Sequence, residues 1–325
     1  MAIAIGAVCY YFVYKPGRHK TEGEIAYVLP QELPVLNTTA VIHNVIATLP
    51  GGQPVRVTER IGEWAHVALK TGRDGWVKQG DLLDAKTHQQ GQDLLTQLEN
   101  MQVQATGRAN DEANLHLSPS RDAPTLADFS TSQPLEVYGR RLVARPPQSG
   151  SPSGPALRDV WYFVRGAGRA GWVLGRFVDL SPPEGLAPYA QGTNMVAWLV
   201  LDTVIDGGKQ VPQYLAADRA GARDIDFNHI RVFTWWVKRH KYVTAYVESD
   251  MDGYFPITVA HAGNTPYFRL RLKDDSGHEY QKVYRLFDTI VRSAGTVDGW
   301  SSNAMPPRRA SRRPRRRLTR RRRVR

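Results

Sequence analysis

The residues that could catalyse a reaction are few and scattered in this chain. Its one cysteine, Cys9, lies in an apolar N-terminal run, where no fold could place a catalytic histidine beside it. The nine histidines form neither a His-x-His pair nor a His-Glu-x-x-His motif, so the sequence offers no cluster of metal ligands. A phosphate-binding Gly-x-x-x-x-Gly-Lys motif is also missing. We therefore expect no catalytic residue, no metal site, no cofactor and no enzymatic activity.

Two short motifs come near to a site but lack a required residue. The stretch "GSPSG" has Pro where a nucleophile elbow needs Ser. The stretch "DMDG", which begins at Asp250, lacks the third acid and the distal Glu of a calcium loop, and Asp-Gly is a preferred hairpin turn. The opposing hypothesis is an enzyme whose site lies in the C-terminal third of the chain. That site would be built from Asp250, Asp252, His240 and Tyr246.

Aromatic residues recur at matching positions in two segments, 62–83 and 158–180. Trp64 in the first segment corresponds to Trp161 in the second, at an offset of 97 residues. Gly75-Trp76-Val77 corresponds to Gly171-Trp172-Val173, at an offset of 96 residues. Short runs of alternating polarity, separated by Gly, Pro and Asn, surround both tryptophans and predict strands. The sequence therefore contains two copies of one small β-architecture.

Both copies resemble bacterial SH3 domains, and the resemblance covers about 140 of the 325 residues. The matching elements of the first copy are Asn37, 45–49, Gly52, Val55, Val57, Trp64 with Val67, and 75–77. Those of the second copy are Asn114, Leu115, Pro119, Val137, Trp161 with Val164, and 171–173. The second copy departs from the pattern by an insertion rich in Pro, Gly and Ser at 144–159. The resemblance implies small β-barrels and an association with cell-wall material.

Strand alternation predicts which side chains of the copies face outward. If Val67 lies in the barrel core, Trp64 and His66 lie on the outer face, where an aromatic ring can support an extended peptide or a glycan. In the alternative, Trp64 packs against the segment between the copies or against a neighbouring domain. The predicted ligand-binding residues are Trp64 and His66 together with their counterparts Trp161 and Phe163.

We expect a mainly β fold with two SH3-like β-barrels joined by a helical linker, then an antiparallel β-rich domain and a disordered basic tail. Residues 84–101 predict the helix, with leucines at helical spacing that pack on a neighbouring barrel and an interruption or delay at Gly91. The expected segments are 1–20 (signal-like or anchor), 24–84 (first SH3-like domain), 85–104 (linker), 105–182 (second SH3-like domain), 190–296 (β-rich domain) and 300–325 (Arg-rich tail).

The N-terminus carries an apolar run of thirteen residues, 2–14, followed by a basic segment. A membrane-spanning helix needs about twenty apolar residues, so the run indicates an export signal or a minimal anchor. Cys9 is a candidate lipidation site, and the alternative is a plain buried cysteine. We therefore expect an extracytoplasmic protein of the cell envelope, attached to the membrane through its N-terminus.

The net charge of +12 belongs to the tail rather than to the body of the chain. Residues 308–325 hold twelve arginines and no acid, which leaves 31 basic residues against 31 acidic ones elsewhere. Such a tail binds polyanions without sequence preference, so we expect no specific nucleic acid partner. We expect a non-catalytic binding or scaffold protein whose SH3-like domains recognise peptidoglycan or an envelope protein or peptide. Polyanion binding through the tail is a further alternative.

Overall fold

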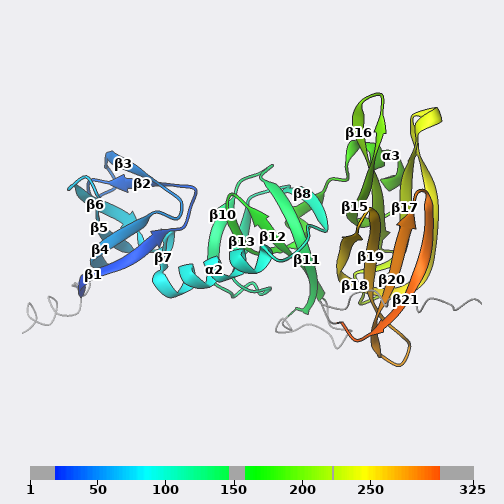
Figure 1. The fold of residues 1–325 in the computed structure, drawn as a ribbon. Coiled ribbons are helices and arrows are strands. Elements are labelled where there is room, and N and C mark those ends of the chain that lie inside the picture. The colour runs from blue at the N-terminus through cyan, green and yellow to red at the C-terminus, as the bar shows by residue number, and fades with distance from the viewer. Residues whose placement is uncertain (1–18, 146–157, 222, 301–325) are drawn as a thin grey trace, which may run out of the picture.

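The computed structural model describes residues 19–145, 158–221 and 223–300, and these residues form three antiparallel sheets of 7 strands each. The sheets follow one another in chain order along the molecule (Figure 1). The expected mainly β fold is confirmed. Cys9, most of the insertion at 144–159 and the Arg-rich tail lie outside the described residues. No helix in the described part of the chain is long and apolar enough to cross a bilayer.

The first sheet is built from residues 19–84. Its strand order is β3-β2-β6-β5-β4-β1-β7. Val28, Val35, Val57 and Val67 are fully buried in its core, as their alternation with polar neighbours predicts. The strands are β1 (His19–Val28), β2 (Glu32–Leu36), β3 (Val45–Pro50), β4 (Pro54–Ile61), β5 (Trp64–Ala68), β6 (Asp74–Lys78) and β7 (Leu82–Asp84), with the short helix η1 (Gln79–Asp81) before β7.

The second sheet repeats the first strand for strand. Its order is β10-β9-β13-β12-β11-β8-β14, which is the first order with every strand replaced by its counterpart. The strands are β8 (Ala105–Ala109), β9 (Ala113–His116), β10 (Thr125–Phe129), β11 (Pro134–Ala144), β12 (Arg158–Gly166), β13 (Arg169–Leu174) and β14 (Val178–Leu180), with η2 (Gly175–Phe177) before β14.

The glycine before each repeated Trp has the same packing role in both sheets. A Cβ atom on Gly75 would lie 2.7 Å from the carbonyl oxygen of Leu36, and one on Gly171 would lie 2.7 Å from that of His116. Gly75 pairs with Val67 and Gly171 with Val164, so the two contacts occur at the same register. The Gly-Trp-Val signature therefore marks a close backbone approach that only glycine permits.

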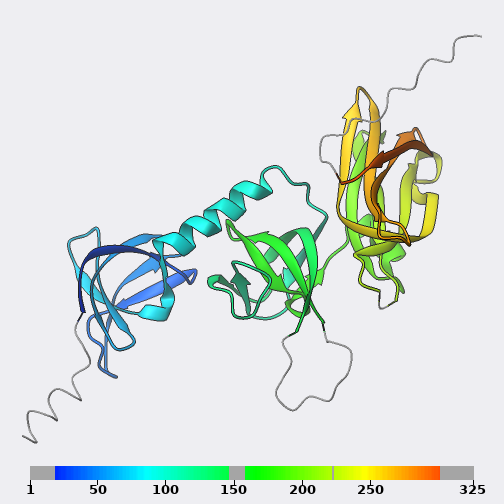
Figure 2. The ribbon, with the colours of Figure 1, turned by 90° about the horizontal axis from the view of Figure 1, so that it is seen from below.

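Helix α2 (Ala85–Leu98) connects the two sheets in the chain and lies against the second one (Figure 2). The expected interruption at Gly91 is wrong, because the helix runs through this residue. A Cβ atom there would lie 3.4 Å from the side chain of Leu126, which is an ordinary contact, so the helix packs beside β10 at this residue. The carboxylate of Asp84 caps the helix by accepting hydrogen bonds from the backbone N–H and the hydroxyl of Thr87 at 2.9 and 2.7 Å.

The third sheet is a strongly curved meander in which consecutive strands pair in order from β15 to β21 (Figure 2). The turn expected at Asp252-Gly253 is wrong, because β18 continues through both residues. A Cβ atom on Gly253 would lie 2.2 Å from the ring of Phe227, so this glycine serves packing instead. The elements are η3 (Glu184–Leu186), α3 (Ala187–Ala190), β15 (Met195–Asp206), β16 (Lys209–Asp218), β17 (Phe227–Trp236), η4 (Val237–Arg239), β18 (Lys241–Ala262), β19 (Thr265–Lys273), β20 (Glu279–Phe287) and β21 (Ile290–Asp298).

Two glutamines attach the segment after α2 to the third sheet. The side-chain amide of Gln104 donates to the carbonyl of Ile257 and accepts from its N–H, at 3.0 and 2.7 Å. The amide of Gln102 does the same with Val259, at 2.7 Å for both bonds. The two side chains thus pair with alternate residues of β18, as a neighbouring strand would.

Candidate ligand-binding face

The outer face of β5 carries the first two predicted ligand residues. Ala65 and Val67 are fully buried, whereas Trp64 and His66 are partly exposed, so the predicted alternation along β5 is confirmed. Trp64 lies opposite Lys78 of β6, and His66 lies opposite Trp76 of the same strand. The face therefore combines two indole rings with an imidazole, all on strands whose other side fills the core.

Three neighbouring strands hold the ring of His66. Its Nδ1 lies 3.0 Å from the hydroxyl of Thr58 on β4, and its Nε2 lies 3.1 Å from a carboxylate oxygen of Asp74 on β6. The ring also packs against Trp76, with ring centroids 4.7 Å apart. A register shift between Val57 and Glu59 leaves Thr58 without a partner on β5 and brings its hydroxyl against His66. We call Thr58, His66, Asp74 and Trp76 the open face.

The open face has the residue types of a nucleophilic triad but not the arrangement that such catalysis needs. The hydroxyl of Thr58 is also placed to donate to the carbonyl of His66, at 3.2 Å. The side chain of Asp74 is 65% exposed, so water competes for the carboxylate that a triad keeps buried. The arrangement instead fixes donors and acceptors beside an indole ring, which is the chemistry of binding a polar ligand with apolar faces.

The second sheet places an apolar cluster at the same four positions. Phe163 stacks on Trp172 with ring centroids 5.0 Å apart, and both lie at the register positions of His66 and Trp76. The other two positions, those of Thr58 and Asp74, are taken by Tyr138 and Ala170. Leu98 of α2 packs on Tyr138, Phe163 and Ala170, with Leu94, Leu95, Met101 and Trp172 around them.

Burial corrects the prediction for the two ligand residues of the second copy. Phe163 is 3% exposed beneath α2, and Trp161 is 1% exposed. Neither ring has an open face, so neither serves as the exposed platform that the sequence predicted. Trp161 packs edge-on against His116 and lines a cavity of about 300 Å³, whose charged lining residues include Arg121 and Arg176.

The four residues of the opposing enzyme hypothesis do not meet in one place. His240 contacts Asp206, with Nδ1 and the carboxylate oxygen 2.6 Å apart. The other three have separate partners. Tyr246 donates to Glu248, Asp250 accepts from Ser249, and Asp252 pairs with Arg223. In the described part of the chain, no group of three or more His, Cys, Asp or Glu side chains is placed to hold a metal ion.

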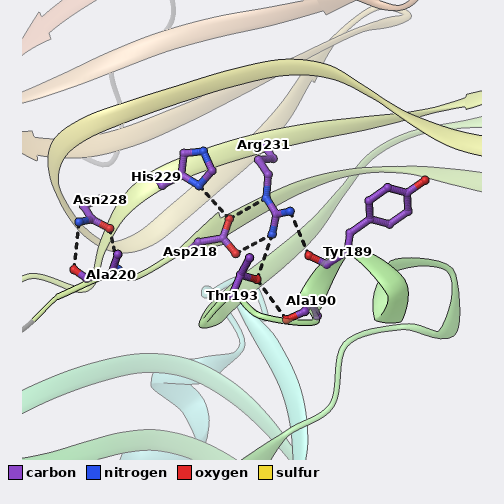
Figure 3. A network of polar contacts seen from close by, with 8 residues as sticks. All are labelled: Tyr189, Ala190, Thr193, Asp218, Ala220, Asn228, His229 and Arg231. Atoms are coloured by element: carbon purple, nitrogen blue, oxygen red, sulfur yellow. Dashed lines mark hydrogen bonds and ion pairs between the residues drawn. The ribbon is translucent and has the colours of Figure 1, made fainter.

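The sequence did not predict the polar network of the third sheet, which is centred on Asp218 (Figure 3). Arg231 donates to both carboxylate oxygens of Asp218, at 2.8 and 2.7 Å, and to the carbonyl of Tyr189 at 3.0 Å. His229 lies 3.2 Å from the same carboxylate. Asp218 is 4% exposed, so the network ties the segment around α3 to the sheet. Arg231 therefore faces a buried acid, and its sequence neighbourhood gave no signal of this.

Comparisons with known proteins add little to this geometry. No family model matches the chain, and no curated protein matches it. A solved structure titled "Structure of NlpC2 from Trichomonas vaginalis" is 12% identical, covers 87% of this chain and 99% of its own, and has a TM-score of 0.18. "Structure of NlpC1 from Trichomonas vaginalis" is 11% identical, with coverages of 87% and 94% and the same TM-score of 0.18. These scores are too low for either likeness to bear on fold or function.

Proposed function

We propose that this chain is a non-catalytic binding protein of the cell envelope, and that the open face recognises its ligand. The two seven-stranded sheets are then tandem SH3-like barrels, α2 is their linker, and the ligand is peptidoglycan or an envelope protein or peptide. The N-terminal run serves as export signal or anchor, with Cys9 as the candidate lipidation site.

One observation carries this proposal. The two sheets share strand order and register, but three of the four positions that α2 covers in the second sheet are polar in the first, where no helix of the described residues covers them. A packing role explains the apolar set, Tyr138, Phe163, Ala170 and Trp172. It does not explain why the first sheet holds a hydroxyl and a carboxylate on either side of one imidazole at its surface. Binding of a polar ligand does explain them.

The bacterial SH3 resemblance of the sequence supports cell-wall material as the ligand. A glycan presents apolar ring faces together with hydroxyl and amide groups, which Trp76 and the side chains around His66 complement. The enzyme alternative finds no support in the third sheet, because His240, Tyr246, Asp250 and Asp252 have separate partners. Polyanion binding through residues 308–325 is a separate proposal, since these arginines lie outside the described residues.

The test is retention of the full chain on purified peptidoglycan and on immobilised envelope proteins. We expect His66→Ala with Trp76→Leu to lower retention on one of these at least about tenfold, because the imidazole and the indole ring that would contact the ligand are both removed. The matched control is Val200→Ser, which changes a side chain that is 48% exposed on the third sheet. Unchanged retention of the folded double variant on both materials would refute the open face as the ligand site.

The tail requires a control of its own, because it binds polyanions whatever the open face does. Retention is measured across a salt series for the full chain and for a chain that ends at Pro306. Retention through the tail falls steeply with salt, whereas retention through neutral hydrogen bonds and ring contacts changes little.

A further inference from the structure

A cleft between the first two sheets is lined by residues from both and from α2. Its volume is about 330 Å³, which suits a small ligand. One side is formed by Gly51, Gly52 and Leu83 of the first sheet, and the other by Leu126 and 167–170 of the second. The helix contributes His88, Gly91, Gln92 and Leu95. None of the lining residues is an acid.

Arg169 is the one charged residue among those that line this cleft. Its Nη1 donates to the carbonyls of Leu29, at 3.1 Å, and Leu126. Its Nη2 donates to the carbonyl of Val28 at 3.0 Å. All three acceptors are neutral backbone groups, and no carboxylate in the described part of the chain forms an ion pair with Arg169. Arg169 therefore joins the two sheets while keeping its charge without a paired anion.

The hydrogen-bond inventory of Arg169 leaves one edge of the guanidinium available. A guanidinium has five N–H groups, and three of them are used by the carbonyls of Val28, Leu29 and Leu126. Nε and one hydrogen of Nη2 have no acceptor among the described residues. In a guanidinium, Nε–H and the Nη2 hydrogen beside it form one edge of the planar group, and such an edge binds both oxygens of a carboxylate.

The surroundings of Arg169 favour an anion over a cation. Burial lowers the pKa of the guanidinium, and the charge of Asp128 raises it in part without forming a hydrogen bond. Burial and the charge of Arg169 lower the pKa of His88, whose ring stacks on Tyr27 with centroids 3.6 Å apart. The cleft thus holds one cation and a ring that favours its neutral form. An arriving carboxylate would neutralise the one charge.

We propose that this cleft is a second binding site, which takes a small ligand through its carboxylate, held by the Nε and Nη2 edge of Arg169. Glycines line the cleft on three sides, so a ligand can approach the backbone closely. Gln92 on α2 supplies an amide for a neighbouring polar group of the ligand. The site is distinct from the open face, and its test does not depend on the function proposed for that face.

The test uses N-acetylalanine, its amide and inorganic phosphate as probes, with the full chain. Binding is followed through the side-chain Nε–H resonance of arginine in an NMR spectrum, assigned to Arg169 by its loss in Arg169→Lys. We expect N-acetylalanine to shift this resonance saturably at millimolar concentration, and the amide to bind at least about tenfold more weakly. Equal binding of the amide, equal or tighter binding of phosphate, or no saturable shift with N-acetylalanine would overturn the proposal.

A second variant tests the location without substituting Arg169. Gly91→Met places a long side chain in the cleft from the helix side, where its Cβ would contact the side chain of Leu126 at 3.4 Å. We expect it to weaken N-acetylalanine binding at least about tenfold. Gly80→Met is the matched control, because a Cβ atom there meets no atom within 4 Å and Gly80 does not line the cleft. Unchanged binding in folded Gly91→Met would place the ligand elsewhere and refute the site.

Discussion

His66 and Phe163 occupy the same position in the two repeated sheets, and each packs against the tryptophan opposite it. The centroid distance is 4.7 Å for His66 and Trp76, and 5.0 Å for Phe163 and Trp172. One position thus holds a hydrogen-bonded imidazole on the surface in the first sheet and a phenyl ring beneath a helix in the second. The residue type at this position therefore distinguishes the exposed face of the first sheet from the helix-covered face of the second.

The two positions should therefore differ in their contribution to stability. Phe163→Ala should lower the free energy of unfolding by about 3–5 kcal/mol, because it leaves a cavity beneath α2. His66→Ala should lower it by about 1 kcal/mol, since the side chain is 22% exposed and loses two hydrogen bonds at the surface. Urea titrations of both variants measure the difference. Equal losses would contradict the assignment of the two faces.

A second prediction concerns the attachment of the third sheet. Gln104 is fully buried, and Gln104→Ala leaves the N–H and carbonyl of Ile257 without these partners, which should cost about 1–3 kcal/mol. Gln102→Ala is the matched change, because it removes the same pair of bonds to Val259 at an exposed position. We expect it to cost clearly less, since water replaces the amide. Amide hydrogen exchange at Ile257 and Val259 reports each loss directly.

A third prediction compares two ion pairs that join the second and third sheets at nearly the same distance. Arg140 and Asp226 lie 2.8 Å apart, and their side chains are 2% and 12% exposed. Arg158 and Asp224 lie 2.7 Å apart, and their side chains are 47% and 56% exposed. Asp226→Ala should cost about 3–5 kcal/mol, because it leaves the charge of Arg140 buried and unpaired. Asp224→Ala should cost about 0–1 kcal/mol. Similar losses of unfolding free energy in the two variants would refute the idea that burial decides how much each ion pair contributes to stability.

Local rules allowed the sequence to predict the repeats and the orientation of β5. Alternation alone separates Ala65 and Val67 from Trp64 and His66, because successive side chains of a strand face opposite sides. The Gly-Trp-Val signature marks a backbone approach that recurs in both sheets. Short alternating runs separated by turn residues predicted the mainly β fold in the same way.

The sequence did not reveal which outer face is covered. Trp161 and Phe163 have the same alternation as Trp64 and His66, but burial by α2 and by the loops around Trp161 depends on contacts far apart in the chain. Thr58 was missed for a similar reason, since a register shift brings it to His66, and Asp74 was missed because it reaches His66 from the neighbouring strand β6. The sequence offered one signal of this difference: the position that holds His66 in the first copy holds the apolar Phe163 in the second.

The last prediction concerns the cap of α2 and its dependence on pH. Hydrogen bonds from the backbone N–H and the hydroxyl of Thr87 lower the pKa of Asp84 from its ordinary value of 3.8. Because this pKa is lowered, the ionised carboxylate stabilises the folded state at pH values above its ordinary pKa. This contribution is lost as pH falls through the pKa of Asp84 in the folded state. Asp84→Ala should therefore cost about 0.5–2 kcal/mol at neutral pH and progressively less in acid.

Asp84→Asn removes the charge but keeps one cap acceptor, because the side-chain oxygen of Asn can accept from the backbone N–H of Thr87 at every pH. Its free energy of unfolding should lie below that of the wild type at neutral pH, and the two should converge as pH falls through the folded pKa of Asp84. Urea titrations across this pH range give the two curves. Asp93→Asn is the control, since it changes an exposed acid of α2 that caps neither end of the helix. If the curves of wild type and Asp84→Asn stay parallel into acid, the carboxylate of Asp84 does not stabilise α2 through its charge.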